Sequence, residues 1–145
     1  MTKVMVFGTF DILHPGHLNF FKQAKKYGDY LIVVVARDRT VLGVKGKLPR
    51  HSERQRLKAV KQTGLVDMSV LGRTGDKYGI IKQHKPNIVT LGYDQRFFTD
   101  ELKANLIKFG LNKTKIVKLK AYKPKKYKSS ILKFYPASAG VNNAD

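Results

Sequence analysis

The sequence of 145 residues contains no cysteine, which excludes disulfide bonds and thiolate metal sites. It has no run that approaches the roughly 18 consecutive apolar residues of a membrane-spanning helix. No signal peptide is visible, because Met1–Phe7 is short and leads directly into a polar motif. We therefore expect a cytoplasmic protein with no membrane partner, and 42% hydrophobic residues are enough for an ordinary core.

Acidic residues are few. Only 10 Asp and Glu accompany 29 Lys and Arg, so the formal net charge is +19, and Leu102–Ala144 contains eleven lysines and no acidic residue. This charge is consistent with nucleic-acid binding, with a solvated lysine-rich face, or with attraction of polyanions such as nucleoside triphosphates. We expect no nucleic-acid partner, because the sequence shows no module that reads bases.

Short apolar segments alternate with amphipathic ones along the chain. The apolar segments predict strands over Lys3–Phe7, Tyr30–Ala36, Met68–Leu71, Ile88–Leu91 and Lys115–Leu119. The amphipathic segments predict helices over Pro15–Tyr27, Ser52–Thr63, Tyr78–His84 and Thr99–Phe109, three of them ended by Gly28, Gly64 and Gly110. The alternation predicts an α/β fold: a single Rossmann-like, doubly wound parallel sheet with helices on both faces.

We expect one domain over residues 1–133 and a disordered tail over residues 134–145, which are small, polar and rich in Gly and Asn. Sheets of this kind bind ligands beyond the carboxyl ends of their strands. Three polar segments directly follow predicted strands, namely Gly8–Asp11, Arg37–Asp38 and Gly92–Asp94. We expect all three to line one site.

The most informative motif lies between the first predicted strand and the first predicted helix: Gly8-Thr9-Phe10-Asp11-Ile12-Leu13-His14-Pro15-Gly16-His17. Pro15 suits the first position of a helix, and Gly16 keeps side-chain bulk away from a ligand. Free backbone N–H groups and the positive end of the helix dipole would then face an anion. The two imidazoles indicate chemistry on a phosphate in addition to phosphate binding.

This motif resembles the signature of the HxGH cytidylyltransferase-like nucleotidyltransferases, and the resemblance extends from about Lys3 to Leu132. Two groups of that family are similar: archaeal-type FAD synthase, which is an FMN adenylyltransferase, and glycerol-3-phosphate cytidylyltransferase. Several segments look like the first group, namely Val35-Ala36-Arg37-Asp38, Lys45-Gly46-Lys47 with Pro49, Gln55-Arg56, Val66-Asp67, Leu71-Gly72, Leu91-Gly92-Tyr93-Asp94-Gln95, and Tyr122 upstream of Ser129-Ser130.

The second group usually carries an Arg-Thr-Glu-Gly-Ile-Ser-Thr-Thr-like segment near its carboxyl end. Here that place holds Lys126-Tyr127-Lys128-Ser129-Ser130-Ile131-Leu132, which lacks the Arg-Thr-Glu part. The archaeal-type group often carries cysteines in this region and this chain has none, so thiol-dependent behaviour is not expected.

The resemblance implies that a phosphate oxygen attacks the α-phosphorus of a nucleoside triphosphate and that pyrophosphate leaves. In that reaction His14 and His17 would contact the triphosphate and stabilise the transition state. Lys45 and Lys47, expected on a flexible loop, would close over the phosphates. The nucleotide-binding set would comprise Gly8, Thr9, Phe10, Asp11, His14, Pro15, Gly16, His17, Arg56, Gly92, Asp94, Tyr122, Ser129 and Ser130.

Within this set the resemblance suggests particular roles. Thr9 and Phe10 would hold the nucleotide through their N–H groups, and Arg56 matches an arginine that contacts the nucleotide. Asp94 and Tyr122 would lie near the ribose and base, and the Ser129-Ser130 pair would cradle the triphosphate at a helix start. Asp11 matches an aspartate near the triphosphate, where it could help to place a divalent ion through water.

Most of these residues also have a structural explanation. With 29 Lys and Arg in the chain, any loop can carry two lysines, and Arg56 could belong to a solvated helix face. Asp94 could cap a turn, Tyr122 could pack in the core, and Ser129 and Ser130 could only cap a helix. His51 and His84 are expected at the surface.

We predict no metal ion held by direct protein ligands and expect a divalent cation, Mg²⁺ or another, that accompanies the triphosphate. The expected substrates are ATP with FMN. The alternative is CTP with glycerol 3-phosphate or a similar polyol phosphate, and a non-catalytic nucleic-acid-binding protein is the third hypothesis. Relatives commonly dimerise, so a homodimer is also expected.

Overall fold

The computed structural model describes residues 1–74, 77–91 and 99–119. Its five strands are β1 (Lys3–Gly8), β2 (Tyr30–Val35), β3 (Met68–Leu71), β4 (Ile88–Leu91) and β5 (Lys115–Lys118). They form one parallel sheet in the order β3-β2-β1-β4-β5. The predicted parallel α/β sheet is therefore confirmed, and each strand ends within one residue of its expected position.

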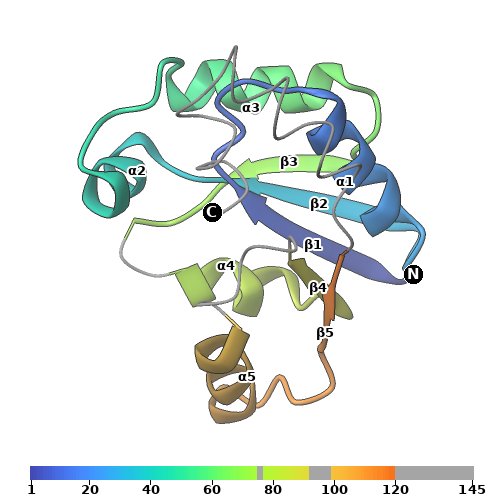
Figure 1. Cartoon of the computed structure of the whole chain (residues 1–145). Helices are drawn as coiled ribbons and strands as arrows, with labels where there is room; N and C mark the ends of the chain where they lie inside the picture. Colours follow the sequence, from blue (N-terminus) through green and yellow to red (C-terminus); the bar gives the residue numbers. More distant parts are fainter. Residues whose placement is uncertain (75–76, 92–98, 120–145) are drawn as a thin grey trace.

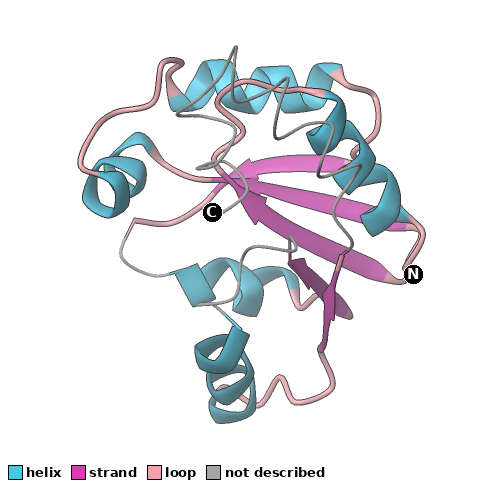
Figure 2. Cartoon of the chain, viewed as in Figure 1, coloured by secondary structure: helices cyan, strands magenta, loops and turns pink. Residues whose placement is uncertain are grey.

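Five helices accompany the sheet: α1 (Pro15–Lys25), α2 (Asp38–Lys45), α3 (Glu53–Gln62), α4 (Lys77–His84) and α5 (Thr99–Lys108). Figure 1 shows α1 and α3 on one face of the sheet and α4 and α5 on the other, and Figure 2 gives the same view by type of element. Both faces are thus covered, as a doubly wound fold requires. Among the described residues, no helix is long and apolar enough to cross a membrane.

Alternation along the central strands divides the core into two layers. Val4 and Val6 of β1 pack with Phe21 of α1 and Val60 of α3, on the first face. Met5, between the two valines, packs on the second face with residues of α4 and α5. Strands that are buried on both faces read as continuous apolar runs, which explains why they could be recognised in the sequence.

Helix α2 was not predicted, and the expected flexible loop around Lys45 is wrong in this respect. Lys45 is the last residue of α2, and Gly46 ends the helix with a φ of 76°. The helix has a single buried residue, Val41, and contains Gly43, so it lacks the apolar periodicity that identifies a helix. It lies at the carboxyl ends of the strands (Figure 1), the edge where a ligand site is expected.

Candidate active site

The predicted motif lies at the switch point of the sheet. β1 is the central strand, and the chain crosses from it toward β2 and β3 on one side, whereas β4 and β5 follow on the other. The motif loop, residues 9–14, leaves the carboxyl end of β1 and leads directly into α1. In open α/β sheets this is the place where ligands bind.

His14 caps helix α1. Its backbone is extended and its Nδ1 accepts a hydrogen bond of 3.0 Å from the N–H of Gly16, while Pro15 occupies the start of the helix. A Cβ at position 16 would lie 2.7 Å from Cε1 of His14, so glycine is required for the ring to reach this place. Because Nδ1 is an acceptor, the neutral ring of His14 carries its proton on Nε2.

The capping geometry corrects one expectation. The first N–H groups of α1 are not free, since Gly16 donates to the His14 ring and the N–H of His17 donates to the His14 carbonyl over 2.9 Å. The helix closes its own start, and Pro15 has no N–H to offer. The dipole and the imidazoles, rather than backbone donors of this turn, are therefore what the helix start presents to an anion.

His14 and His17 stack against one another. Their ring centroids are 3.9 Å apart with an angle of 30° between the planes, and both residues are buried. Nε2 of His14 and both ring nitrogens of His17 are buried, and among the described residues none of the three makes a hydrogen bond of ordinary geometry. Buried polar atoms without partners are uncommon in folded proteins and are a mark of a functional site.

Burial also sets the charge of the two rings. Burial lowers the pKa of His14. Burial and then the proximity of His14 lower the pKa of His17 to about 3, against a smaller opposing effect of the Ile12 backbone. Both imidazoles are consequently neutral at pH 7, and each offers one N–H. Perturbed titration combined with unsatisfied nitrogens is the combination expected of groups that meet a charged ligand.

Phe10 packs against the histidine pair through His17. Its backbone has a φ of 53°, which is rare for a residue with a side chain. Its ring is buried, and the ring centroid lies 5.5 Å from that of His17 and 5.2 Å from that of Phe21. A Cβ on Gly8 would lie 2.5 Å from this ring, so Gly8 makes room for it. Strained backbone of this kind persists only when the surrounding packing enforces it, and it is concentrated at active sites.

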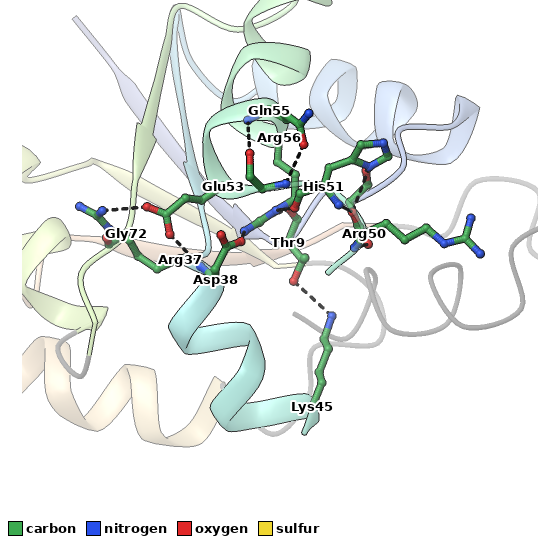
Figure 3. A network of polar contacts seen from close by, with 12 residues as sticks. Thr9, Arg37, Asp38, Lys45, Arg50, His51, Glu53, Gln55, Arg56 and Gly72 are labelled. Atoms are coloured by element: carbon green, nitrogen blue, oxygen red, sulfur yellow. Dashed lines mark hydrogen bonds and ion pairs between the residues drawn. The ribbon is translucent and has the colours of Figure 1, made fainter. Parts of the chain in front are cut away.

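Arg56 is buried against the motif loop. The residue is 1% exposed. Its guanidinium donates to the carbonyl oxygens of Thr9 (2.8 Å) and His51 (3.1 Å) and pairs with the carboxylate of Asp38 at 2.8 Å (Figure 3). The predicted arginine therefore contacts the motif loop, and its hydrogen bonds hold that loop.

Glu53 and Arg37 extend this network. Glu53 accepts from the N–H of Asp38 at 2.9 Å and from the Arg37 guanidinium at 3.0 Å, and Arg37 also donates to the Gly72 carbonyl. The segment after β2 and the start of α3 are thereby joined to the motif loop, as expected for Arg37–Asp38. Glu53 and His51 were not among the predicted site residues, because sequence spacing does not show which donor or acceptor a side chain meets in the fold.

Two further predicted residues make contacts at the motif loop: Lys45 reaches the loop from α2, and Asp11 is part of the loop. Nζ of Lys45 donates to Oγ1 of Thr9 at 3.2 Å, which brings the end of α2 against the loop (Figure 3). The Asp11 carboxylate accepts from the N–H groups of Arg50 and His51 at 2.8 and 2.9 Å. Burial raises the pKa of Asp11, but these hydrogen bonds together with the His51 side chain outweigh it, so the pKa is lowered overall. Lys47 is exposed.

Comparison with known proteins identifies the family. The family model described as cytidylyltransferase-like matches residues 5–133. The chain belongs to this cytidylyltransferase-like family. The family resemblance expected from the HxGH motif is therefore confirmed.

Curated relatives of this cytidylyltransferase-like protein are named FAD synthase. One from Thermoplasma volcanium is 44% identical and covers 84% of each chain. One from Methanosarcina barkeri is 48% identical over 77% of this chain and 78% of its own. One from Archaeoglobus profundus is 45% identical over 90% of this chain and 82% of its own. The expected similarity to archaeal-type FAD synthases is thus confirmed.

Solved structures agree with the fold. The lipopolysaccharide core biosynthesis protein from Thermoplasma volcanium has a TM-score of 0.79 at 44% identity, covering 84% of this chain and 98% of its own. A protein of unknown function from Archaeoglobus fulgidus has a TM-score of 0.68 at 22% identity, covering 82% and 90%. The second similarity concerns the fold alone.

The remaining predicted site residues of this cytidylyltransferase-like chain lie outside the described residues: Gly92, Asp94, Tyr122, Ser129 and Ser130. The predicted tail, residues 134–145, also lies outside them. Among the described residues, no group of three or more His, Asp or Glu side chains is arranged to hold a metal ion. The carboxylates nearest the motif, those of Asp11, Asp38 and Glu53, accept hydrogen bonds from N–H donors instead.

Proposed function

We propose that this protein transfers AMP from ATP to the phosphate of FMN, giving FAD and pyrophosphate. The observation that carries the proposal is the stacked, buried pair of His14 and His17 at the start of α1, at the switch point of the sheet. The relatives named FAD synthase, at 42–48% identity, support ATP and FMN as the substrates.

The reaction requires little acid–base chemistry from the protein. An oxygen of the FMN phosphate forms a bond to the α-phosphorus of ATP, and the bond from that phosphorus to the oxygen bridging to the β-phosphate breaks. The attacking oxygen is already an anion, so no general base is needed. The protein aligns the two phosphates and neutralises the negative charge that moves onto the leaving pyrophosphate.

The motif provides donors for that purpose. Because Nδ1 of His14 is held by Gly16, the Nε2–H of His14 is its donor to a phosphate oxygen. His17 adds a second imidazole in the same stack. A bound triphosphate would favour the protonated form of either ring, since an anion nearby stabilises the charged imidazole. Donors preorganised in a buried site stabilise developing charge more than donors in water do.

The two lysines supply permanent positive charge. Lys45 lies over the loop through its contact with Thr9, and Lys47 follows two residues later. A divalent cation would arrive bound to the triphosphate, because the carboxylates around the motif are engaged with N–H donors. We place recognition of the ribose, base and triphosphate tail at Gly92, Asp94, Tyr122, Ser129 and Ser130. We also predict that the protein forms a homodimer.

Pyrophosphate release tests the proposal. ATP and CTP would each be supplied with FMN or with glycerol 3-phosphate, with wild type beside His17→Ala and His84→Ala, a histidine outside the motif. Of the four mixtures, we expect pyrophosphate release only in the one with ATP and FMN. This release should be abolished in His17→Ala and retained in His84→Ala.

Two results would contradict this proposal in different ways. Release with CTP and glycerol 3-phosphate would retain the mechanism and replace the substrates. The absence of release in all four mixtures, under varied divalent cations, would reject nucleotidyl transfer.

A further inference from the structure

The segment that carries Lys47 is tied to the motif at both ends. We call residues 46–50 the strap. At its start, Nζ of Lys45 contacts Oγ1 of Thr9 at 3.2 Å. At its end, the N–H groups of Arg50 and His51 donate to the two oxygens of the Asp11 carboxylate. Lys47 therefore lies in a short connection that spans Thr9 and Asp11, two residues of the same loop.

The His51 side chain reinforces the second tie. Its Nδ1 lies 2.9 Å from the Asp11 carbonyl oxygen and 3.2 Å from Oδ1 of the same residue. Both of these atoms are acceptors, so Nδ1 carries a proton whatever the charge of the ring. The ring is 49% exposed, whereas the Asp11 side chain is only 10% exposed. The more exposed His51 ring therefore lies against a carboxylate that is largely shielded from solvent.

The tie continues into a rigid element. The carbonyl of His51 accepts from Nε of Arg56, a buried residue of α3. The next residue, Ser52, begins α3 with a capping box in which Ser52 and Gln55 each bond the other's backbone N–H. His51 therefore joins the motif loop to a helix that packs on the sheet, and not to another loop.

We infer that His51 is a positioning residue that acts through Asp11 to anchor the strap and so holds Lys47 over the phosphate site. The inference rests on the proposed function only for what Lys47 does there. It gives Asp11 a different part from the one the family resemblance suggests: its carboxylate fastens the strap and does not help to place a divalent ion. It also explains why an exposed histidine outside the HxGH motif makes three contacts with that motif, all of them to Asp11.

Amide hydrogen exchange tests the anchor without substrate. We expect the Arg50 amide to exchange about tenfold faster in His51→Ala than in wild type, because the Asp11 carboxylate that it donates to loses its contact with the His51 ring. His51→Asn, which keeps an N–H donor, should restore most of the protection. The Ser52 amide, held within the capping box, is the internal control, and His84→Ala is the matched variant.

Steady-state kinetics tests the consequence. In His51→Ala we expect kcat to fall about fivefold with little change in KM for ATP. The reason is that Lys47, on the loosened strap, acts on the leaving pyrophosphate. His51→Asn should recover kcat. Equal protection of Arg50 in wild type and His51→Ala, or no recovery in His51→Asn, would overturn the inference. If wild type makes no FAD, the proposed function fails, while the exchange data still decide whether His51 anchors the strap.

Discussion

At the scale of single residues, the histidine pair makes stability depend on pH. The pKa of His17 falls from 6.5 to about 3 on folding, because of burial first and of His14 second. Between these values the unfolded chain binds more protons than the folded one, so stability is lost as the pH falls from about 6.5 toward 3. Asp11 and Asp67, whose pKa values are lowered from 3.8, lose their contribution only at lower pH.

We therefore expect the free energy of unfolding of wild type to decrease between pH 6.5 and 4, with a slope approaching about 1.4 kcal/mol per pH unit for this one proton. His17→Gln, which cannot be protonated, should show a flatter dependence. Urea unfolding at several pH values measures both. Parallel curves for the two proteins would show that His17 is not kept neutral by burial.

Two glycines provide a second prediction at this scale. A methyl group on Gly8 would collide with the Phe10 ring, so Gly8→Ala should lower the free energy of unfolding by about 1–3 kcal/mol and reduce activity strongly. Gly43 lies within α2 and has no atom within 4 Å of an added Cβ. Gly43→Ala should therefore stabilise the protein by about 0.5–1 kcal/mol.

Thermal unfolding and FAD formation would be measured on both alanine variants. Their opposite signs matter, because the two substitutions are chemically identical and differ only in the space around the residue. Equal effects would mean that the Phe10 ring can move aside without cost and that the strained conformation of Phe10 is unimportant for the motif.

At the scale of elements, Arg56 connects α3 to the motif loop and to the start of α2. Arg56→Lys would keep the charge but lose the fork that reaches Thr9, His51 and Asp38 together. We expect a loss of about 2–4 kcal/mol of stability, since buried acceptors are left unpaired. Arg54→Lys is the matched control, because Arg54 is exposed on the same helix and should change stability by less than about 0.5 kcal/mol.

Urea unfolding of Arg56→Lys and Arg54→Lys checks this prediction. KM for ATP would separate two interpretations of Arg56. A large increase in KM at unchanged stability would support the direct nucleotide contact that the family resemblance implies. A loss of stability, with kcat reduced as the loop loosens, would support the role of Arg56 in holding the loop.

The elements also show what the sequence could and could not predict. Strands buried on both faces and helices ended by Gly64 or Gly110, both at positive φ, carry their signals locally and were predicted. Gly28 was expected to end α1 in the same way, but α1 ends at Lys25 without such a glycine, and a Cβ at Gly28 would instead lie 2.5 Å from the Thr2 carbonyl. A close approach of two segments is not a local signal.

The site also has a part that is local in the sequence and a part that depends on distant segments. The HxGH motif is contiguous, so its place at the end of β1 followed from the sequence. Two of the three partners of Arg56 lie 18 and 47 residues away, and those of Asp11 lie 39 and 40 residues away. Which carboxylate meets which donor depends on how α2 and α3 fold back over β1, and only the three-dimensional structure contains that information.

At the scale of the whole molecule, the net charge of +19 acts on every anion that approaches. Both proposed substrates are polyanions, so the summed field should raise their local concentration at low ionic strength. Salt screens charges over about 10 Å at 0.1 M, but it weakens contacts inside a buried site much less. The general field and the buried groups of the motif should therefore respond differently to salt.

We expect KM for ATP to rise severalfold between about 0.05 and 0.5 M NaCl, while kcat changes by less than about twofold, because the reacting phosphates meet donors of the buried stack. Initial rates over this range, at constant free divalent cation, measure both constants. A KM independent of salt would mean that the charge serves something other than these substrates. Salt-sensitive binding of RNA without turnover of any triphosphate would assign the charge to nucleic acid instead, since counterion release from a polyphosphate backbone produces that dependence.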